Sequence, residues 1–368
     1  MEKTRTENRI KKPDMTMLAL VLLLVAFGLV MLLSTSAYNG RVRFGDSAYY
    51  FKKQLFATAL GLLAMYAVTR LDYRLLVRFA PTAYLLSIGF STAVLFFGKE
   101  INGSKRWLSL GPLSFQPSEL AKVAVILFLA WQIENTRKST DSLWFMCRTM
   151  LTLLPIVGLV GSNNLSTAII ILGIGVILIF VSNPRYLPFV GVGTVGIGVV
   201  AVFLAAESYR LERLAIWRNP EIYEKGFQTI QGLYAIGSGG LFGRGLGSSL
   251  QKLGFVPEAQ NDMIFSIICE ELGLFGALLL IVLFGLLLWR LCVISLHSRD
   301  LLGALICAGI MAHMSIQVIL NIAVVTNTIP NTGITLPFVS YGGTSVVFLL
   351  AEMGLALSVS MHNGHSPA

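Results

Sequence analysis

Four carboxylates stand close together in residues 254–273, GFVPEAQNDMIFSIICEELG, where a polar segment passes into an apolar one. They are Glu258, Asp262, Glu270 and Glu271. An ionisable group at membrane depth is costly unless it is paired or hydrated, so its presence favours a functional site. The chemistry open to such acids is proton abstraction from a hydroxyl group or the binding of a cation.

The first two acids are expected near the start of a helix. Pro257 suits the first helical position, which would put Glu258 in the first turn and Asp262 one turn further on the same side. The helix N-terminus would favour the ionised form of Asp262, as a base requires, and Glu258 could tune its acidity or bind a cation. A capping role without chemistry remains open on the residues alone. Glu270 and Glu271 would lie about 12 to 13 Å deeper, paired with a basic or amide group on a neighbouring helix.

A second charged pair occurs in QPSELAK, where Pro117 suits the start of a helix and Glu119 and Lys122 stand three residues apart on one face. A self-neutralising ion pair would explain both residues without chemistry. Alternatively, Lys122 contacts a substrate phosphate together with Arg106 and Lys105, and Glu119 orients the lysine.

A third polar group follows at intervals of four: His313, Gln317 and Asn321 form a stripe on one helical face. We expect them to make hydrogen bonds between helices. The prolines and glycines in the next segment, TNTIPNTGITLPFVSYGGTS, forbid a continuous helix. Non-helical backbone near a membrane must be buried or line a cavity, so we predict a cavity beside the span that begins at residue 263.

The elements that position these residues are membrane helices. The chain of 368 residues is 55% hydrophobic and 13% charged, which excludes a soluble globular protein. We predict an all-α membrane protein with ten transmembrane helices in a single domain, residues 15–361, with tails at 1–14 and 362–368. The predicted spans are 15–34, 54–70, 80–98, 116–133, 146–162, 165–182, 186–206, 263–290, 301–325 and 342–361.

The distribution of charged residues predicts how these spans are oriented in the membrane. The basic N-terminus resembles a signal peptide, but the apolar run is too long, so we expect it to remain as an anchor. The positive-inside rule puts both termini in the cytoplasm. The opposite face is basic too, and an anionic ligand and anionic lipid headgroups explain this equally well. The net charge of +9 gives no case for nucleic-acid binding. The outer basic residues are Arg41, Arg43, Lys52, Lys53, Lys99, Lys105 and Arg106.

Residues 207–262 are predicted to form a long outer loop between the seventh and eighth helices. Its aromatic residues indicate order, with a helix near 226–236. The run GSGGLFGRGLGSS matches no phosphate-binding loop, so we interpret it as a turn region packed closely on another surface. The cysteines and histidines have no metal-ligand spacing, and no metal site is predicted from them.

Three long segments stand in an order and spacing that closely resemble the SEDS family of shape, elongation, division and sporulation proteins, which includes FtsW, RodA and SpoVE. They are NGSKRWLSLGPLSFQPSELAK, AIGSGGLFGRGLGSSLQKLGFVPEAQNDMIFSIICEELG and PNTGITLPFVSYGGTS. The PEAQNDMIF form and the length are more similar to the FtsW and SpoVE branch than to RodA.

The resemblance implies a peptidoglycan glycosyltransferase that polymerises lipid II on the outer face of the bacterial cytoplasmic membrane, at the division septum or in sporulation. It also implies a class B penicillin-binding protein, a transpeptidase, as partner, together with other division proteins. Carried over by motif, the catalytic aspartate is Asp262, Glu258 is an active-site acid, Arg106, Glu119 and Lys122 line the substrate cavity, and Ser340, Gly342 and Gly343 belong to the signature before the last helix.

One position departs from the family. Many members open the sixth helix with an aspartate, whereas this chain has Asn164. An asparagine can still cap a helix by accepting a hydrogen bond, but it cannot transfer a proton as an acid does. A role that needs the acid therefore cannot be carried over.

These observations lead to one mechanism and two rivals. In the mechanism, Asp262 takes the proton from the 4-hydroxyl of the acceptor lipid II, and that oxygen attacks the anomeric carbon of the undecaprenyl-linked glycan. Lys122 and Arg106, with a divalent cation such as Mg²⁺ or Mn²⁺ as an open addition, meet the charge on the leaving pyrophosphate. The rivals are a lipid flippase, which should have polar residues through the full membrane depth, and a non-catalytic division scaffold.

Overall fold

The protein is mostly helical, as its apolar runs predict. The computed structural model describes residues 12–101, 104–110, 113–136, 143–183 and 208–362, with scattered positions between 191 and 198. Within these residues, seven helices are long and apolar enough to cross a membrane. They lie in α1 (Met15–Phe44), α4 (Ala80–Phe97), α6 (Leu143–Asn163), α7 (Leu165–Ser182), α11 (Ile264–Leu296), α12 (Leu301–Val325) and α13 (Gly343–His362).

Two more expected spans are occupied by helices that carry charges, α2 (Tyr49–Arg70) and α5 (Pro117–Asn135). Most of the expected span 186–206 lies outside the described residues. The count of ten helices therefore stays a prediction. The chain nevertheless has the several apolar helices of a multi-pass membrane protein.

Local signals set several helix ends. Asp14, Asn164 and Asp300 each accept a hydrogen bond from a backbone N–H in the first turn of α1, α7 and α12. Pro117 lies in the first turn of α5, as predicted. Asn164 thus caps its helix by accepting from Thr167 at 3.2 Å, the role that an asparagine can keep without the acid.

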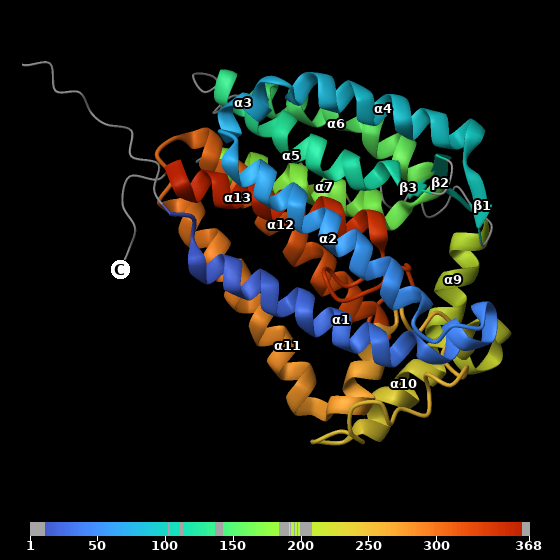
Figure 1. Cartoon of the computed structure of the whole chain (residues 1–368). Helices are drawn as coiled ribbons and strands as arrows, with labels where there is room; N and C mark the ends of the chain where they lie inside the picture. The colour runs from blue at the N-terminus through green and yellow to red at the C-terminus, as the bar shows by residue number, and fades with distance from the viewer. Residues whose placement is uncertain are drawn as a thin grey trace, which may run out of the picture.

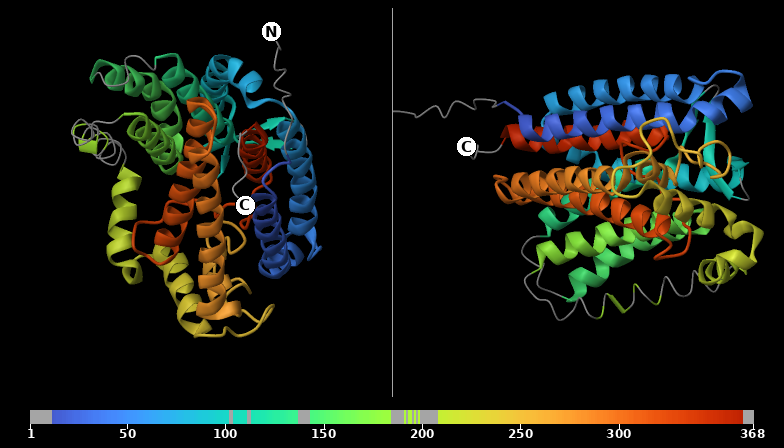
Figure 2. Two further views of the ribbon diagram at one scale, coloured as in Figure 1. Left: turned by 90° about the vertical axis from the view of Figure 1, so that its left-hand side faces the viewer. Right: turned by 90° about the horizontal axis from the view of Figure 1, so that it is seen from below.

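The helices form a bundle with α13 inside it, packed against α2, α5 and α12 (Figures 1 and 2). The start of α1 and the end of α13 lie side by side, because the backbone N–H of Asp14 donates to Ser360 Oγ at 3.1 Å. Both ends of the described chain are therefore on one side of the bundle, as an even number of crossings requires. The cytoplasmic orientation of that side remains a prediction.

A small sheet corrects the all-α expectation. Residues predicted as a loop form β1 (Lys99–Ile101), β2 (Ser104–Leu110) and β3 (Leu113–Phe115), joined in an antiparallel order β1-β2-β3. The sheet lies at the end of the bundle opposite the chain termini (Figure 1). Its strands are too short for a strong alternating pattern, which is why the sequence indicated only a connection.

The long segment before α11 is ordered, with α9 (Ser208–Arg218), the short 3₁₀ helices η2 (Pro220–Ile222) and η3 (Glu224–Gly226), and α10 (Phe227–Gly239). The predicted helix near 226–236 is confirmed. The glycine run after α10 packs on α11 as expected: side chains at Gly239 and Gly243 would collide with the carbonyl groups of Cys269 and Glu271.

Helix α11 departs from the prediction because it breaks at Gly273, which has φ 67° and ψ −168°. The axis turns sharply there (Figure 1), so helical rise does not give the depth of Glu270 and Glu271. Both are fully buried. Glu271 pairs with Lys252 Nζ at 2.6 Å and accepts from Ser34 of α1 at 2.8 Å. The expected basic partner is therefore present, but it lies in the glycine-rich loop rather than on a neighbouring helix.

Glu270 has the same kind of role. Its carboxylate accepts from the hydroxyl of Ser249 and from the backbone N–H of Leu250 at 3.0 Å, and it lies 3.6 Å from Arg244. The two acids thus hold the loop that follows α10 onto the broken helix. Their structural role, predicted from the sequence, is consistent with these contacts.

Candidate functional site

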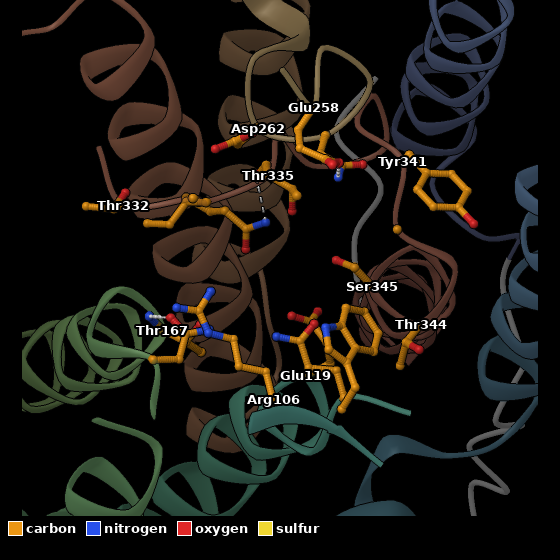
Figure 3. A pocket seen from close by; sticks show the side chains of 18 of the residues that line it. Arg106, Glu119, Thr167, Glu258, Asp262, Thr332, Thr335, Tyr341, Thr344 and Ser345 are labelled. Carbon is orange, nitrogen blue, oxygen red and sulfur yellow. Dashed lines mark hydrogen bonds between the residues drawn. The ribbon is translucent and has the colours of Figure 1, made fainter. Parts of the chain in front are cut away.

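A cavity of about 1370 Å³ lies among the elements that the sequence motifs mark. Its wall draws on α2, β2, α5, α9, α10, the turns before α11, the segment after α12 and the start of α13. Asp262 and Glu258 lie at one end of it and Arg106 and Glu119 at the other (Figure 3). The lining residues that bear on the chemistry are Lys52, Lys53, Arg106, Trp107, Glu119, Lys122, Asn164, Arg213, Gln228, Glu258, Asp262, Gln317, Thr335, Tyr341, Gly342 and Gly343.

Asp262 is 8% exposed and lies in a series of turns, two residues before the first residue of α11. The predicted helix start at Pro257 is therefore wrong, and with it the expectation that a helix N-terminus lowers the pKa. Burial instead raises the pKa of Asp262 to about 6, and the charge of Glu258 adds to the increase, while Arg213 and Gln228 oppose it. A carboxylate with this pKa is a better proton acceptor than an ordinary one and is still largely ionised at neutral pH.

Glu258 lines the same end of the cavity in a left-handed backbone conformation, with φ 53°. Its carboxylate accepts from Asn261 Nδ2 at 2.6 Å and lies 3.5 Å from Arg43 of α1. Such a φ is uncommon outside glycine and persists where surrounding contacts enforce it. The structure brings Glu258 and Asp262 together, but by a turn rather than by helical spacing.

Contacts from distant segments hold this turn. Gln260 accepts from the backbone N–H of Tyr341 at 2.9 Å, and its side-chain oxygen accepts from Asn39 of α1 at 2.8 Å. Asn321 of α12 donates to the carbonyl oxygen of Asp262 at 2.9 Å and to that of Ile334 at 2.7 Å. Asn321 therefore ties the catalytic candidate to the segment after α12.

The opposite wall contains the predicted ion pair. Lys122 Nζ lies 3.0 Å from Glu119 Oε1 and donates to Gln317 Oε1 at 3.2 Å. Lys122 is 2% and Glu119 6% exposed. Arg106 of β2 lines the cavity and its Nε donates to the carbonyl oxygen of Asn163 at 3.1 Å. This end of the cavity can therefore meet an anion with two cationic side chains.

The remaining candidates lie in two different places. Gly342 and Gly343 line the cavity, and the N–H of Gly342 donates to Gln54 Oε1 of α2 at 3.1 Å. Lys105 and Ser340 do not line it; Lys105 borders a small pocket beside it. Ser340 is buried and its hydroxyl accepts from the N–H of Leu336 at 2.8 Å, which fixes the fold of the segment before α13.

The structure adds residues that sequence reasoning did not select. Gln228 of α10 lies 3.5 Å from Asp262 Oδ1, and Lys52, Lys53 and Tyr341 line the cavity. The external basic loops were a signal for the two lysines. Single polar residues such as Gln228 carry no signal of that kind, because their place depends on tertiary packing.

Asp262 and Glu258 supply carboxylate oxygens at one end of the cavity. The described residues include no cluster of three or more histidine, cysteine or acidic side chains that could hold a metal ion by themselves. Mg²⁺ is commonly bound by one or two carboxylates together with substrate phosphates. Asp262 and Glu258 fit that smaller requirement.

Comparison with known proteins gives a consistent result along the whole chain. The family model described as cell cycle protein, FtsW/RodA/SpoVE, matches residues 14–365. Stage V sporulation protein E of Bacillus subtilis (strain 168) is 38% identical over 364 residues, covering 95% of this chain and 98% of that protein. A probable peptidoglycan glycosyltransferase FtsW of Trichlorobacter lovleyi is 33% identical over 369 residues, covering 98% and 96%.

Solved structures agree. A chain from a study of the structural coordination of polymerization and crosslinking by a peptidoglycan synthase complex superposes with a TM-score of 0.81 at 32% identity, covering 96% of this chain and 99% of that chain. The rod shape determining protein RodA of Thermus thermophilus gives a TM-score of 0.71 at 30% identity, covering 96% and 98%.

Proposed function

The chain belongs to the FtsW/RodA/SpoVE family of cell cycle proteins, and from this membership we infer that it is a peptidoglycan glycosyltransferase acting in division or sporulation. Its substrate is lipid II, and its product is a glycan strand still attached to the lipid carrier. This proposal rests mainly on Asp262, which is buried and lies across one cavity from Arg106 and Lys122. Burial raises the pKa of its carboxyl group to about 6.

The geometry suits a glycosyl transfer with a base at one end and cations at the other. Asp262 accepts the proton of the acceptor 4-hydroxyl while the oxygen forms a bond to the anomeric carbon of the growing chain. The bond from that carbon to the lipid pyrophosphate breaks, and the pyrophosphate leaves with the electron pair. Lys122 and Arg106, which line the same cavity, stabilise its negative charge.

Glu258 acts on this step through charge, because its carboxylate raises the pKa of Asp262. Lys122 keeps its place through Glu119. A divalent cation held by Asp262 and Glu258 would supply positive charge to the phosphates when bound, and the described side chains perform the proton transfer without it.

The setting of the reaction follows from the topology. The cavity wall includes residues of β2 and α9, two elements that lie at the end of the bundle away from the chain termini (Figure 1). The positive-inside rule assigns the termini to the cytoplasm. Lipid II would then be polymerised on the outer face of the bacterial cytoplasmic membrane, at the septum in the division case. A neighbouring fold comes from a peptidoglycan synthase complex, which supports a class B penicillin-binding protein as partner.

The proposal is tested with the purified full-length chain and lipid II, with the glycan products separated on a gel. The wild-type chain should form polymer, and Asp262→Asn, which keeps the volume but not the basicity, should form less by a factor of about 100 or more. Polymer from the variant at the wild-type rate would contradict the role of Asp262. A wild-type chain that moves lipid II between leaflets without polymer would instead indicate a flippase.

A further inference from the structure

A line of buried polar side chains leads away from the cavity wall into the bundle. It begins at Lys122 of α5, passes through Gln317 and His313 of α12, and ends at Glu352 of α13. All four residues are 2% exposed or less. Lys122 and Gln317 line the cavity, whereas His313 and Glu352 lie behind it.

The hydrogen-bond partners of Gln317 fix the orientation of its side-chain amide. Its Nε2 donates to the carbonyl oxygen of Thr335 at 3.0 Å, and a carbonyl oxygen can only accept. Its Oε1 therefore faces Lys122 Nζ at 3.2 Å and His313 Nε2 at 2.8 Å. Since Oε1 carries no hydrogen, His313 Nε2 must carry one.

Glu352 pairs with the other ring nitrogen, with its Oε2 2.8 Å from His313 Nδ1. Because Nε2 already carries a hydrogen, the proton between Nδ1 and Oε2 is a second one, so the pair is either an imidazolium with a carboxylate or a neutral imidazole with a carboxylic acid. A neutral imidazole beside an ionised Glu352 would carry its hydrogen on Nδ1, and two acceptors, Nε2 and Gln317 Oε1, would then face each other. Without Glu352, the buried Nδ1 would lose the contact that holds the ring against Gln317.

Helix packing alone does not account for Glu352. Its second oxygen, Oε1, is buried and has no hydrogen-bond partner among the described residues. A buried charged or half-satisfied group is weak support for stability, and apolar residues of similar size often serve a helix interface as well or better. The pair His313 and Glu352 therefore calls for a second role.

Lys122 supplies that role. An ammonium group has three hydrogens, and in the described structure Glu119 Oε1 and Gln317 Oε1 accept two of them. The third is available to a ligand in the cavity. We propose that Glu352 and His313 are positioning residues that, together with the Thr335 carbonyl group, hold Gln317 Oε1 in place and so hold the Lys122 ammonium in place for the leaving pyrophosphate. This proposal rests on the proposed function, because it assigns Lys122 to that leaving group.

Two substitutions at one position separate positioning from packing. Glutamine at position 313 places an amide N–H at about the distance of Nε2 along the side chain, so His313→Gln can still donate to Gln317. Asparagine reaches only about as far as Nδ1, so His313→Asn cannot. Both lose the imidazole ring, so a packing role predicts similar damage from both.

The assay is the initial rate of lipid II polymerisation by the full-length chain over a range of lipid II concentrations, with melting in detergent measured in parallel. We expect His313→Asn to lower kcat by about 10-fold or more with little change in KM, the signature of an interaction realised in the transition state. His313→Gln should stay within about threefold of the wild type. Glu352→Gln should resemble His313→Gln, because its amide N–H can donate to Nδ1 and keep the hydrogen on Nε2.

The outcomes are distinct. Equal loss in His313→Gln and His313→Asn, or a wild-type rate in His313→Asn, overturns the positioning role. If His313→Asn does not fold, Glu352→Leu against Glu352→Gln gives the same comparison, with loss expected only in Glu352→Leu. A wild-type chain that forms no polymer, or an active Asp262→Asn, would instead count against the proposed function itself.

Discussion

The raised pKa of Asp262 predicts how the rate of lipid II polymerisation depends on pH. If Asp262 must be ionised to accept the proton, kcat/KM for lipid II should follow its ionised fraction in the free protein. With a pKa of about 6, that fraction is about 99% at pH 8 and about 9% at pH 5. The rate should therefore fall about 10-fold between pH 8 and pH 5, because a base is lost as the pH drops through its pKa.

Glu258→Gln tests the cause of that pKa. The Glu258 carboxylate raises the pKa of Asp262, so its removal should lower the pKa and move the acid limb of the profile to lower pH. Desolvation is the larger cause, so the limb should shift and still be present. The position of the limb is the quantity to measure, since it does not depend on how far the substitution lowers the absolute rate.

Glu221→Gln is the matched control, because it removes the same charge from η2 without changing a residue that lines the cavity. Its profile should coincide with that of the wild type. A wild-type profile that is flat between pH 5 and pH 8 would refute Asp262 as the titrating base. A limb that stays in place in Glu258→Gln would refute the electrostatic link between the two acids.

Three further predictions concern residues that support the loops and helices around the site. Each is measured as the thermal stability of the purified protein in detergent. Gly273→Ala should destabilise the protein by about 2 kcal/mol or more, because a left-handed φ and a close backbone contact both disfavour a side chain there. The control is Gly285→Ala, which has open space around it and should be neutral or slightly stabilising. Equal effects of the two substitutions would contradict the role of Gly273 in the helix break. Lys252→Met should lower the stability of the protein by about 3 kcal/mol, because it leaves Glu271 buried without its cation. Adding Glu271→Gln should restore part of that stability. A double variant that is no more stable than Lys252→Met would argue against the ion pair. Asn164→Ala should lower the stability of the protein by about 1 kcal/mol, because α7 loses its cap, whereas Asn164→Asp should retain the cap. Similar melting temperatures for the two variants would show that the cap does not stabilise the protein.

The sequence predicted the elements whose causes are local. The ends of α7 and α12 coincide with the predicted spans 165–182 and 301–325, because an apolar run and a capping side chain lie next to each other in the chain. Pro117 and the Glu119–Lys122 pair were predicted for the same reason, since three residues along one helix are neighbours in space. The cavity beside α11 was inferred from a segment that cannot be helical, and that inference also depended on local backbone chemistry.

The turn that carries Glu258 could not be predicted in this way. Pro257 is a strong local signal for a helix start, and the signal failed because contacts from far along the chain determine the backbone there. Tyr341 and Asn39 both bind Gln260, and Asn321 binds the carbonyl group of Asp262. The break at Gly273 has the same origin: the N–H groups of Leu274 and Phe275 donate to the loop carbonyls of Gly240 and Leu241, at 2.9 and 3.1 Å.

The four carboxylates of residues 254–273 differ in what remains for them to bind. Glu270 and Glu271 accept hydrogen bonds from loop groups and lie against Arg244 and Lys252, so their lone pairs and charge are already committed. Asp262 is also buried, but it lines the cavity, and the described hydrogen bond of its carboxylate with another side chain is a 3.5 Å one from Gln228. Burial raises the pKa of Asp262 to about 6 although the charge of Arg213 opposes the increase, and Asp262 lines the cavity, which is why we assign the proposed proton transfer to Asp262 rather than to Glu270 or Glu271.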